Sequence, residues 1–254
     1  MPDFSNKVIA ITGATGGIGQ ATAQSIVDAG GSVVLGDLDS EAIDALSSRW
    51  GEQATGRVVD VTKAEDNQAL IEQALSVFGR LDGLFLNAGI EGRVGAFETQ
   101  TEADWQRVFA VNIEGPRLGA LAALPALQRT GGGSVVMTSS VAGVRGAPNL
   151  TPYVTSKHAL VGLMRSLAAE WGPKGIRVNT LNPGPVDNRM MRSIEEQSSP
   201  EHGNEVKAAF VSRIPLGRYV SNEECAQMAT FLLSDESAGV TGNTYMVDGG
   251  YCSG

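Results

Sequence analysis

The chain has 254 residues, of which 42% are hydrophobic, with 32 glycines, 10 prolines and 2 cysteines. Glycine makes up about 13% of the chain against roughly 7% in average usage, but no Gly-X-Y period accompanies this excess, so a collagen-like chain is excluded. The hydrophobic fraction excludes a disordered chain, and the formal net charge of −9 at pH 7 argues against a nucleic-acid-binding protein, which would need a basic surface.

The N-terminal residues lack the basic flank and the long apolar segment of a targeting signal. No stretch approaches the roughly 20 apolar residues that span a bilayer. Cys225 and Cys252 have no metal-ligand spacing, and two cysteines form no disulfide framework. We therefore expect a cytoplasmic protein with no membrane segment and no metal site.

Short β-branched or apolar runs alternate along the chain with longer amphipathic segments. Several of these runs are apolar throughout, as expected for strands buried on both faces of a parallel sheet. The clearest helical faces run from Ile18 to Ala29 and from Leu160 to Trp171. The alternation predicts right-handed βαβ crossovers and a doubly wound sheet in one domain covering residues 1–254. The predicted strands are Val8–Thr12, Ser32–Asp37, Arg57–Asp60, Gly83–Asn87, Ser134–Ser139, Arg177–Asn182 and Thr244–Val247.

The first predicted strand leads directly into a glycine-rich turn, Thr12-Gly13-Ala14-Thr15-Gly16-Gly17-Ile18-Gly19, and a helix follows. This is the context of a dinucleotide-binding turn, in which glycines allow a tight turn, close approach of a pyrophosphate, and close packing of helix and strand. The pyrophosphate would lie against the positive end of the helix. The alternative is a glycine-rich turn that binds nothing.

Asp37 ends the second predicted strand, 18 residues after Gly19. An acid at this position is expected to bind the adenosine ribose hydroxyls, and its charge would repel a 2′-phosphate. No Lys or Arg lies in the glycine-rich turn or beside Asp37. The sequence therefore predicts NAD rather than NADP as the cofactor.

Tyr153 and Lys157 are four residues apart and lie on one face of a predicted helix. A free tyrosine has a pKa near 10, and a neighbouring cation together with a positively charged nicotinamide would favour the phenolate. Tyr153 is thus a candidate general acid/base for a hydroxyl or carbonyl group. Ser140 lies 13 residues earlier at the end of the fifth predicted strand, where it can bind the same substrate oxygen.

Together, these motifs resemble the short-chain dehydrogenase/reductase family over almost the whole chain. The resemblance implies a seven-stranded parallel sheet of the Rossmann type, hydride transfer between a nicotinamide cofactor and an alcohol or ketone, and a homotetramer or homodimer. The matching motifs are Thr12-Gly13…Gly17-Ile18-Gly19, Asp60-Val61, Asn87-Ala88-Gly89, Asn112, Ser140, Tyr153…Lys157, Asn182-Pro183-Gly184, and Val240-Thr241-Gly242…Val247-Asp248-Gly249-Gly250.

The resemblance also implies residue roles. Tyr153 is the expected acid/base, Lys157 lowers its pKa and holds the nicotinamide ribose, and Ser140 orients the substrate oxygen. Asn112 supports a water-linked proton relay from Lys157, unless it simply caps or kinks a helix. The residues expected to contact the cofactor, besides Tyr153 and Lys157, are Gly13, Thr15, Gly16, Gly17, Ile18, Gly19, Asp37, Leu38, Asp60, Val61, Asn87, Ala88, Gly89, Pro183, Gly184, Val186 and Asn188.

One position departs from the family pattern: Asn188 stands where a cofactor-contacting threonine is usual, and its amide can donate and accept in its place. For Asn87, the alternative to a cofactor contact is that its side chain simply holds a turn. Neither His158 nor His202 is expected to be catalytic, and Ser140 is preferred to the adjacent Ser139.

The segment from Asn188 to about Ile214 is expected to form a flexible lid over the substrate. Its glutamates disfavour a strongly anionic substrate, although Arg145, Arg189 and Arg192 leave that option open. We predict a secondary alcohol, possibly cyclic or aryl, as the small-molecule substrate. A 3-oxoacyl-type or sugar reductase and a catalytically silent nucleotide-binding protein remain alternatives. The residues expected to line an apolar pocket are Ile90, Val94, Val141, Val144, Ala147 and Pro148.

Overall fold

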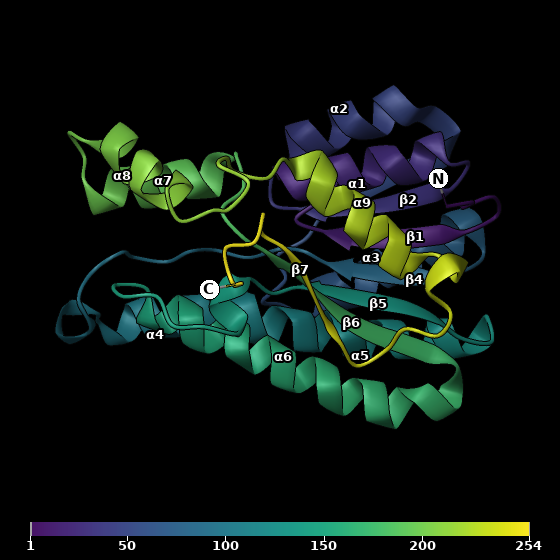
Figure 1. The fold of residues 1–254 in the computed structure, drawn as a ribbon. Coiled ribbons are helices and arrows are strands. Elements are labelled where there is room, and N and C mark those ends of the chain that lie inside the picture. Colours follow the sequence, from purple (N-terminus) through teal and green to yellow (C-terminus); the bar gives the residue numbers. More distant parts are fainter. Residues whose placement is uncertain (1, 254) are drawn as a thin grey trace.

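The seven predicted strands form one parallel sheet in the computed structural model, which describes residues 2–253 (Figure 1). The spatial order is β3-β2-β1-β4-β5-β6-β7. The strands are β1 (Val8–Thr12), β2 (Ser32–Asp37), β3 (Ala54–Val58), β4 (Gly83–Leu86), β5 (Gly133–Thr138), β6 (Ile176–Pro183) and β7 (Thr244–Val247). The predicted fold class, a doubly wound parallel sheet, is confirmed.

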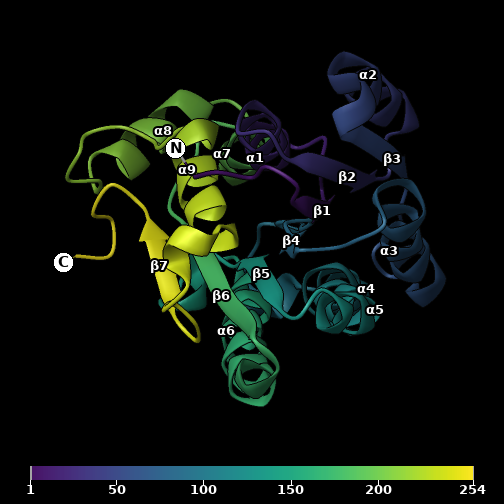
Figure 2. The same cartoon turned by 90° about the vertical axis from the view of Figure 1, so that its right-hand side faces the viewer.

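Helices cover both faces of the sheet, as the view along the strands shows (Figure 2). One apolar core joins the sheet to α3, α5 and α6, and a second joins its other face to α1, α2 and α9. The helices are α1 (Gly17–Asp28), α2 (Ser40–Trp50), α3 (Ala64–Phe78), α4 (Glu102–Phe109), α5 (Gly115–Arg129), α6 (Thr151–Trp171), α7 (Arg189–Ser198), α8 (Gly203–Val211) and α9 (Asn222–Leu233). None of the helices within residues 2–253 combines the length and the apolar character that crossing a membrane requires.

The chain order reverses between the neighbouring strands β1 and β4. The loops that leave their carboxyl ends therefore run in opposite directions and open a crevice, which is where open α/β sheets bind ligands. The glycine-rich turn follows β1 at this point, and Asn87 directly follows β4. The fold thus brings together motifs that are 75 residues apart, since the Thr12 hydroxyl accepts a hydrogen bond from the Asn87 backbone at 3.1 Å.

The predicted strand boundaries hold within one residue except at β3. That strand covers Ala54–Val58 instead of Arg57–Asp60. As the outermost strand at one edge of the sheet, β3 is partly exposed and carries no continuous apolar run, and Val59 just beyond its end is buried. Asp60 then turns the chain by accepting hydrogen bonds from the Thr62 backbone and hydroxyl. The apolar signal of Val58 and Val59 therefore marks the end of the strand.

Candidate active site

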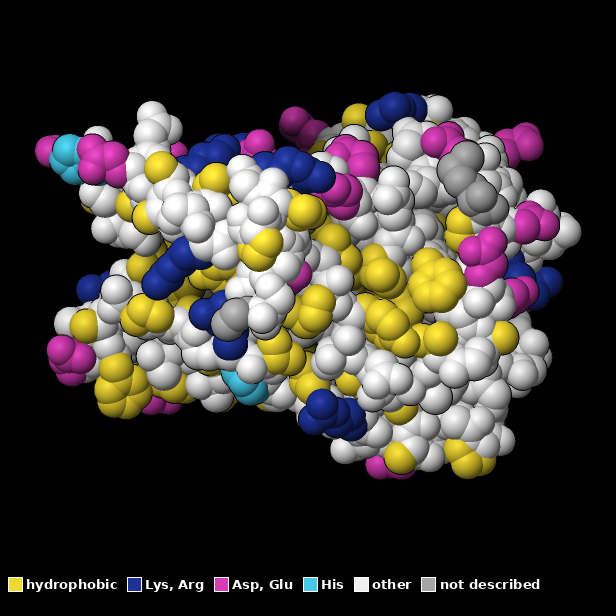
Figure 3. Space-filling model, in the orientation of Figure 1, with side chains coloured by type: hydrophobic (Ala, Val, Ile, Leu, Met, Phe, Trp, Pro, Cys, Tyr) yellow, Lys and Arg dark blue, Asp and Glu magenta, His cyan; other side chains and the backbone are white. Residues whose placement is uncertain are grey.

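A cavity of about 1050 Å³ lies at the carboxyl ends of the strands, between the sheet and the α7–α8 segment. Figure 3 shows the same region as a hollow in the molecular surface, with apolar side chains inside it. One half of the cavity is lined by residues at the carboxyl ends of β1, β2 and β3. The other half is lined by residues that follow β5 and β6 and by residues of α6 and α7. The cavity therefore joins the predicted cofactor residues to the predicted catalytic residues.

The glycine-rich turn forms part of the cavity wall because its backbone is packed too closely for side chains. A Cβ atom on Gly13, whose φ is +63°, would lie 2.8 Å from the backbone of Ala88, and one on Gly19 would lie 2.2 Å from the Gly13 carbonyl oxygen. Gly17 begins α1, so backbone N–H groups of the first helical turn face the cavity. This wall fits a pyrophosphate group.

Asp37 lies at the cavity edge and is held by the same turn. Its Oδ2 accepts hydrogen bonds from the Thr15 backbone at 2.9 Å and from the Thr15 hydroxyl at 2.7 Å, and its Oδ1 accepts one from Leu38 at 2.7 Å. Asp39 and Asp60 also line this end, and the Thr62 hydroxyl lowers the pKa of Asp60 by its hydrogen bond. No Lys or Arg of the ends of β2 and β3 lines the cavity.

Asn87 ties three elements together under the cavity. Its Nδ2 donates to the Gly13 carbonyl at 3.0 Å, and its Oδ1 accepts from the Thr138 hydroxyl at 3.0 Å. The side chain therefore fixes the glycine-rich turn relative to β4 and β5, and it also lines the cavity.

The two serines after β5 have different surroundings. Ser139 is buried, and its hydroxyl donates to the Lys157 carbonyl in α6 at 2.9 Å. The hydroxyl of Ser140 caps the short turn after it by accepting from the Ala142 backbone at 3.1 Å, and it faces the Tyr153 hydroxyl in the cavity. This geometry favours Ser140 over Ser139 as the substrate-binding serine.

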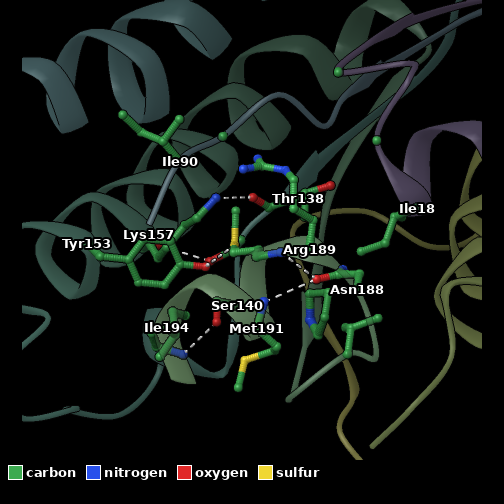
Figure 4. Close-up of a pocket in the computed structure, with 18 of the residues that line it drawn as sticks. Ile18, Ile90, Thr138, Ser140, Tyr153, Lys157, Asn188, Arg189, Met191 and Ile194 are labelled. Atoms are coloured by element: carbon green, nitrogen blue, oxygen red, sulfur yellow. Dashed lines mark hydrogen bonds between the residues drawn. The ribbon is translucent and has the colours of Figure 1, made fainter. Parts of the chain in front are cut away.

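Tyr153, in the first turn of α6, is 8% exposed and lines the cavity beside Ser140 (Figure 4). Burial raises the pKa of Tyr153 to about 12, a hydrogen bond with Ser140 acts in the opposite direction, and the Glu91 carboxylate raises the pKa further. The protein alone therefore does not produce the lowered pKa that the sequence predicted. At neutral pH the phenol holds its proton, which suits a general acid.

Lys157 lies one helical turn after Tyr153, with its Nζ 5.5 Å from the centroid of the Tyr153 ring. The Nζ donates to the Thr138 carbonyl at 2.7 Å, and the side chain is 2% exposed. Burial lowers the pKa of Lys157 to about 7. A Cβ on Gly89 would lie 3.3 Å from this nitrogen, so glycine at this position keeps one side of the ammonium group accessible.

Asn112 lies in a π-helical turn, Ala110–Glu114, between α4 and α5. Its Oδ1 accepts from the Ile90 backbone, and its Nδ2 donates to the Ile90 carbonyl and the Ser156 hydroxyl, all within 3.0 Å. The side chain is fully buried and does not line the cavity. It positions the loop after β4 against α6, and the π turn interrupts the helical hydrogen-bond ladder at this site.

Comparisons with known proteins place the whole chain in one family. A family model described as enoyl-(acyl carrier protein) reductase matches residues 13–252. Cyclohexanol dehydrogenase from Acinetobacter sp. (strain SE19) is 38% identical over 254 residues, covering 98% of this chain and 96% of that protein. The chain belongs to the short-chain dehydrogenase/reductase family.

Solved structures agree with this assignment. Levodione reductase has a TM-score of 0.95 and 34% sequence identity to this chain, with 98% of this chain and 99% of the other covered. A 3-ketoacyl-(acyl-carrier-protein) reductase from Brucella melitensis complexed with NADH has a TM-score of 0.89 and 29% identity, covering 97% and 98%. The chain is accordingly an oxidoreductase of this family.

The predicted lid folds into the two helices α7 and α8. Asn188 begins α7, and its Oδ1 accepts from the backbone of Met190 and Met191, while its Nδ2 lies 3.5 Å from the Asn222 Oδ1. The Asn188 side-chain oxygen thus caps α7. The Asn188 Nδ2 is the group that can still donate a hydrogen bond to a ligand. Gly184 is packed against Asp248, where a Cβ would lie 2.8 Å from the backbone.

Most of the predicted site residues line one cavity, with three exceptions. Gly19 and Asn112 lie beneath the lining, where they pack or hydrogen-bond the residues above them. Val144, expected in the apolar pocket, is instead 45% exposed and outside the cavity, because the turn after Val141 directs it outward. Neither His158 nor His202 lines the cavity, and both are exposed. Within the described part of the chain, no group of three His, Cys, Asp or Glu side chains is gathered as a metal ion would need.

Sequence reasoning missed several residues around the substrate end. Tyr251 reaches the cavity from the C-terminal segment, and its carbonyl accepts a hydrogen bond from Arg145 at 2.8 Å. The Sδ of Met190 lies 4.0 Å from the Tyr153 hydroxyl. Glu91 is 8% exposed and close enough to affect the pKa of Tyr153. No local pattern signals these contacts, since they join segments distant in the sequence.

Proposed function

We propose that this short-chain dehydrogenase/reductase oxidises a secondary alcohol with NAD and reduces the corresponding ketone with NADH. The observation that carries the proposal is that Ser140, Tyr153 and Lys157 meet at one end of a cavity whose other end holds Asp37. A nicotinamide held beside Lys157 and Tyr153 would supply the hydride acceptor for the carbinol carbon, or the hydride donor for the carbonyl carbon.

The chain's own residues supply the proton chemistry. In ketone reduction, the Tyr153 hydroxyl donates its proton to the substrate oxygen, which the Ser140 hydroxyl orients. The raised pKa of Tyr153, about 12, keeps that proton in place until the oxygen becomes basic. In alcohol oxidation, the phenol first gives its proton to solvent, and a charged Lys157 beside the ring stabilises the phenolate. The phenolate then takes the proton of the substrate hydroxyl as the hydride leaves the carbinol carbon. Asn112 and its π turn would support a water-linked path that carries the phenol proton past Lys157 to solvent.

Asp37 supports NAD as the cofactor. Its carboxylate is fixed by Thr15 and Leu38 at the adenosine end, where a 2′-phosphate would meet Asp37 and Asp39 without a lysine or arginine of the lining nearby. The related reductase complexed with NADH is consistent with this choice.

Replacing Asp37 with alanine tests the cofactor preference. The wild type is expected to have a higher kcat/KM with NAD than with NADP, and Asp37→Ala should lower this ratio at least about tenfold, because the like-charge repulsion is removed. The measurement is initial-rate kinetics with both cofactors. The exposed Asp28→Ala variant serves as the control. A wild type that prefers NADP contradicts the proposal.

The substrate end is apolar, which supports a secondary alcohol with a hydrocarbon ring or chain. Five of the six predicted residues line it: Ile90, Val94, Val141, Ala147 and Pro148. The relative named cyclohexanol dehydrogenase makes cyclic alcohols the first candidates. An absorbance screen for NADH formation over cyclic, aryl and aliphatic secondary alcohols tests the reaction class. Oxidation of none of them, with either cofactor, would favour a catalytically silent nucleotide-binding protein.

We further propose a cytoplasmic homotetramer, or a homodimer. Every residue of the edge strand β7 is partly exposed, and Phe97 and Leu121 are 64% and 59% exposed, which leaves apolar surface for a second copy. Light scattering after size-exclusion chromatography measures the assembly, and a monomer at micromolar concentration would contradict it.

A further inference from the structure

The two ends of the cavity carry opposite charge. The carboxylates that line it, Asp37, Asp39 and Asp60, all follow β2 or β3 at the adenosine end. The segments around the substrate end contribute arginines and no carboxylate to the lining: Arg107, Arg145, Arg189 and Arg213. Figure 3 shows Lys and Arg side chains beside the hollow. The protein's net charge of −9 therefore does not describe its substrate end.

The glutamates of the lid do not offset these arginines in the lining. Glu195 is 7% exposed and accepts a hydrogen bond from the Tyr219 hydroxyl at 2.8 Å, away from the cavity lining. Glu196, Glu201 and Glu205 are exposed and do not line the cavity either. The glutamate-rich composition of the lid thus does not describe the charge of the cavity lining.

Two of the arginines, Arg145 and Arg213, belong to segments that contact the C-terminal residues. The Arg145 guanidinium stacks 4.7 Å from the centroid of the Tyr251 ring, and one of its nitrogens donates to the Tyr251 carbonyl. The residues before Tyr251 pack on the chain after Arg213, since a Cβ on Gly250 would lie 2.9 Å from the Pro215 ring. Tyr251 therefore connects the surroundings of Arg145 and Arg213 at one end of the cavity.

Neither Arg145 nor Arg213 forms an ion pair with a carboxylate within residues 2–253, although Arg145 uses one donor on Tyr251. The lid residue Arg192, in contrast, pairs with Asp187 at 3.3 Å and does not line the cavity. Guanidinium groups bind planar or tetrahedral oxyanions through several donors at once. Arg189 directly follows Asn188, which is a candidate cofactor contact. The candidate anion-binding pair is therefore Arg145 and Arg213.

We propose that the preferred substrate is a secondary alcohol or ketone that also carries an anionic group, a carboxylate, sulfonate or phosphate, and that Arg145 and Arg213 bind that group. This inference rests on the proposed function, since it concerns the same reaction and the same cavity. The hydrocarbon part of the substrate would lie against the apolar lining between Tyr153 and the arginines.

A substrate series with one carbinol and different end groups tests the inference. The probes are 5-hydroxyhexanoate, 5-hydroxyhexane-1-sulfonate and 5-hydroxyhexyl phosphate, with methyl 5-hydroxyhexanoate as the uncharged match and cyclohexanol as the neutral cyclic reference. At least one anion should have a kcat/KM about tenfold or more above that of the methyl ester, because charge-assisted hydrogen bonds are strong. The end group of the best probe identifies the type of anion.

The variants Arg145→Gln and Arg213→Gln should bring the ratio of anion to ester kcat/KM toward one, chiefly through KM. Arg192→Gln, which removes a lid arginine that is already paired, should leave the ratio as in the wild type. Arg213→Gln keeps the test valid if Arg145→Gln disturbs the C-terminal segment.

An ester that is oxidised as efficiently as every anion would overturn the inference and leave the proposed function intact. An anion preference that survives in both arginine variants would overturn the assignment to Arg145 and Arg213. Absence of oxidation for all probes, cyclohexanol included, would instead contradict the proposed function and the inference with it.

Discussion

Two regions enclose the cavity, and their side chains are held by different kinds of contact. The catalytic floor, which consists of the ends of β4 and β5 with the first turns of α6, is fixed by buried hydrogen bonds such as Lys157 to Thr138 and Asn112 to Ser156. The polar contacts of the lid, residues 188–214, are mostly exposed, such as the ion pairs of Arg192 and Lys207 with Asp187. Exposed pairs contribute roughly 0–1 kcal/mol each.

This difference indicates that the floor positions the catalytic residues and that the lid adapts to the ligand. The buried network holds Tyr153 and Lys157 in place before a ligand arrives, whereas the lid can adjust to the ligand with small changes in free energy. The single buried polar contact of the lid, Tyr219 to Glu195, is the exception. Changes on the floor should therefore affect chemistry and stability strongly, and changes in the lid should affect substrate affinity weakly.

The largest effect on cofactor binding is expected for Gly19→Ala, beneath the cofactor end of the cavity. The added Cβ would lie 2.2 Å from the Gly13 carbonyl oxygen, so the glycine-rich turn must move. Ordinary overpacking costs roughly 1–3 kcal/mol, which corresponds to about 5- to 150-fold in cofactor affinity if the whole cost falls on binding. NADH fluorescence titration measures this loss. Gly162→Ala, in α6 with no atom within 4 Å of the added Cβ, is the control and should bind normally.

Lys157→Met should remove most activity, by about 100-fold or more, yet stabilise the protein without cofactor. The folded pKa of Lys157, about 7, lies below the ordinary value of 10.5. The unfolded chain binds more protons between these values, so the stability of the wild type rises with pH from about 7 to about 10.5, and the burial penalty is greatest below pH 7.

The gain in Tm of Lys157→Met should therefore be largest near pH 6 and shrink toward pH 10. Differential scanning fluorimetry across this range measures it, with Lys174→Met, an exposed lysine, as the control. An equal change in Tm at pH 6 and pH 10 would mean that burial does not lower the pKa of Lys157.

The smallest effect is expected in the lid. Tyr219→Phe removes the hydroxyl that donates to Glu195 and leaves this buried carboxylate without that partner. Burial raises the pKa of Tyr219 well above its ordinary value, so the bond is present throughout the usual assay range. We expect KM for the alcohol to rise severalfold, on the order of 1 kcal/mol, with kcat within about twofold. A kcat that falls as far in Tyr219→Phe as in Lys157→Met would contradict the different roles of the floor and the lid.

The same division explains what the sequence could predict. The sheet, the glycine-rich turn and the pairing of Tyr153 with Lys157 follow from local patterns: apolar runs, glycines at fixed spacing and one helical turn. The strand β3 was misplaced because an edge strand is half exposed and lacks a continuous apolar run. The charge of the cavity lining could not be predicted from the lid's composition, because composition does not show that Glu195 is buried against Tyr219.

The contact between Arg145 and Tyr251 joins segments 106 residues apart, and no spacing rule predicts it. The pKa of Tyr153 was also beyond local reasoning. A neighbouring lysine suggested a lowered value, but the depth of burial, a property of the whole fold, raises it to about 12 in the protein alone. Residues encoded by motifs were therefore predictable, and residues brought together by long-range packing were not.

Steady-state turnover of Tyr153→Phe tests whether the Tyr153 hydroxyl is the acid/base of the reaction. The phenylalanine keeps the ring against Lys157 and removes only the hydroxyl. We predict that kcat falls at least about 100-fold while NADH affinity stays within about twofold of the wild type. Tyr245→Phe, in β7 and outside the cavity, should retain full activity. Wild-type turnover by Tyr153→Phe would contradict the assignment of Tyr153 as the acid/base.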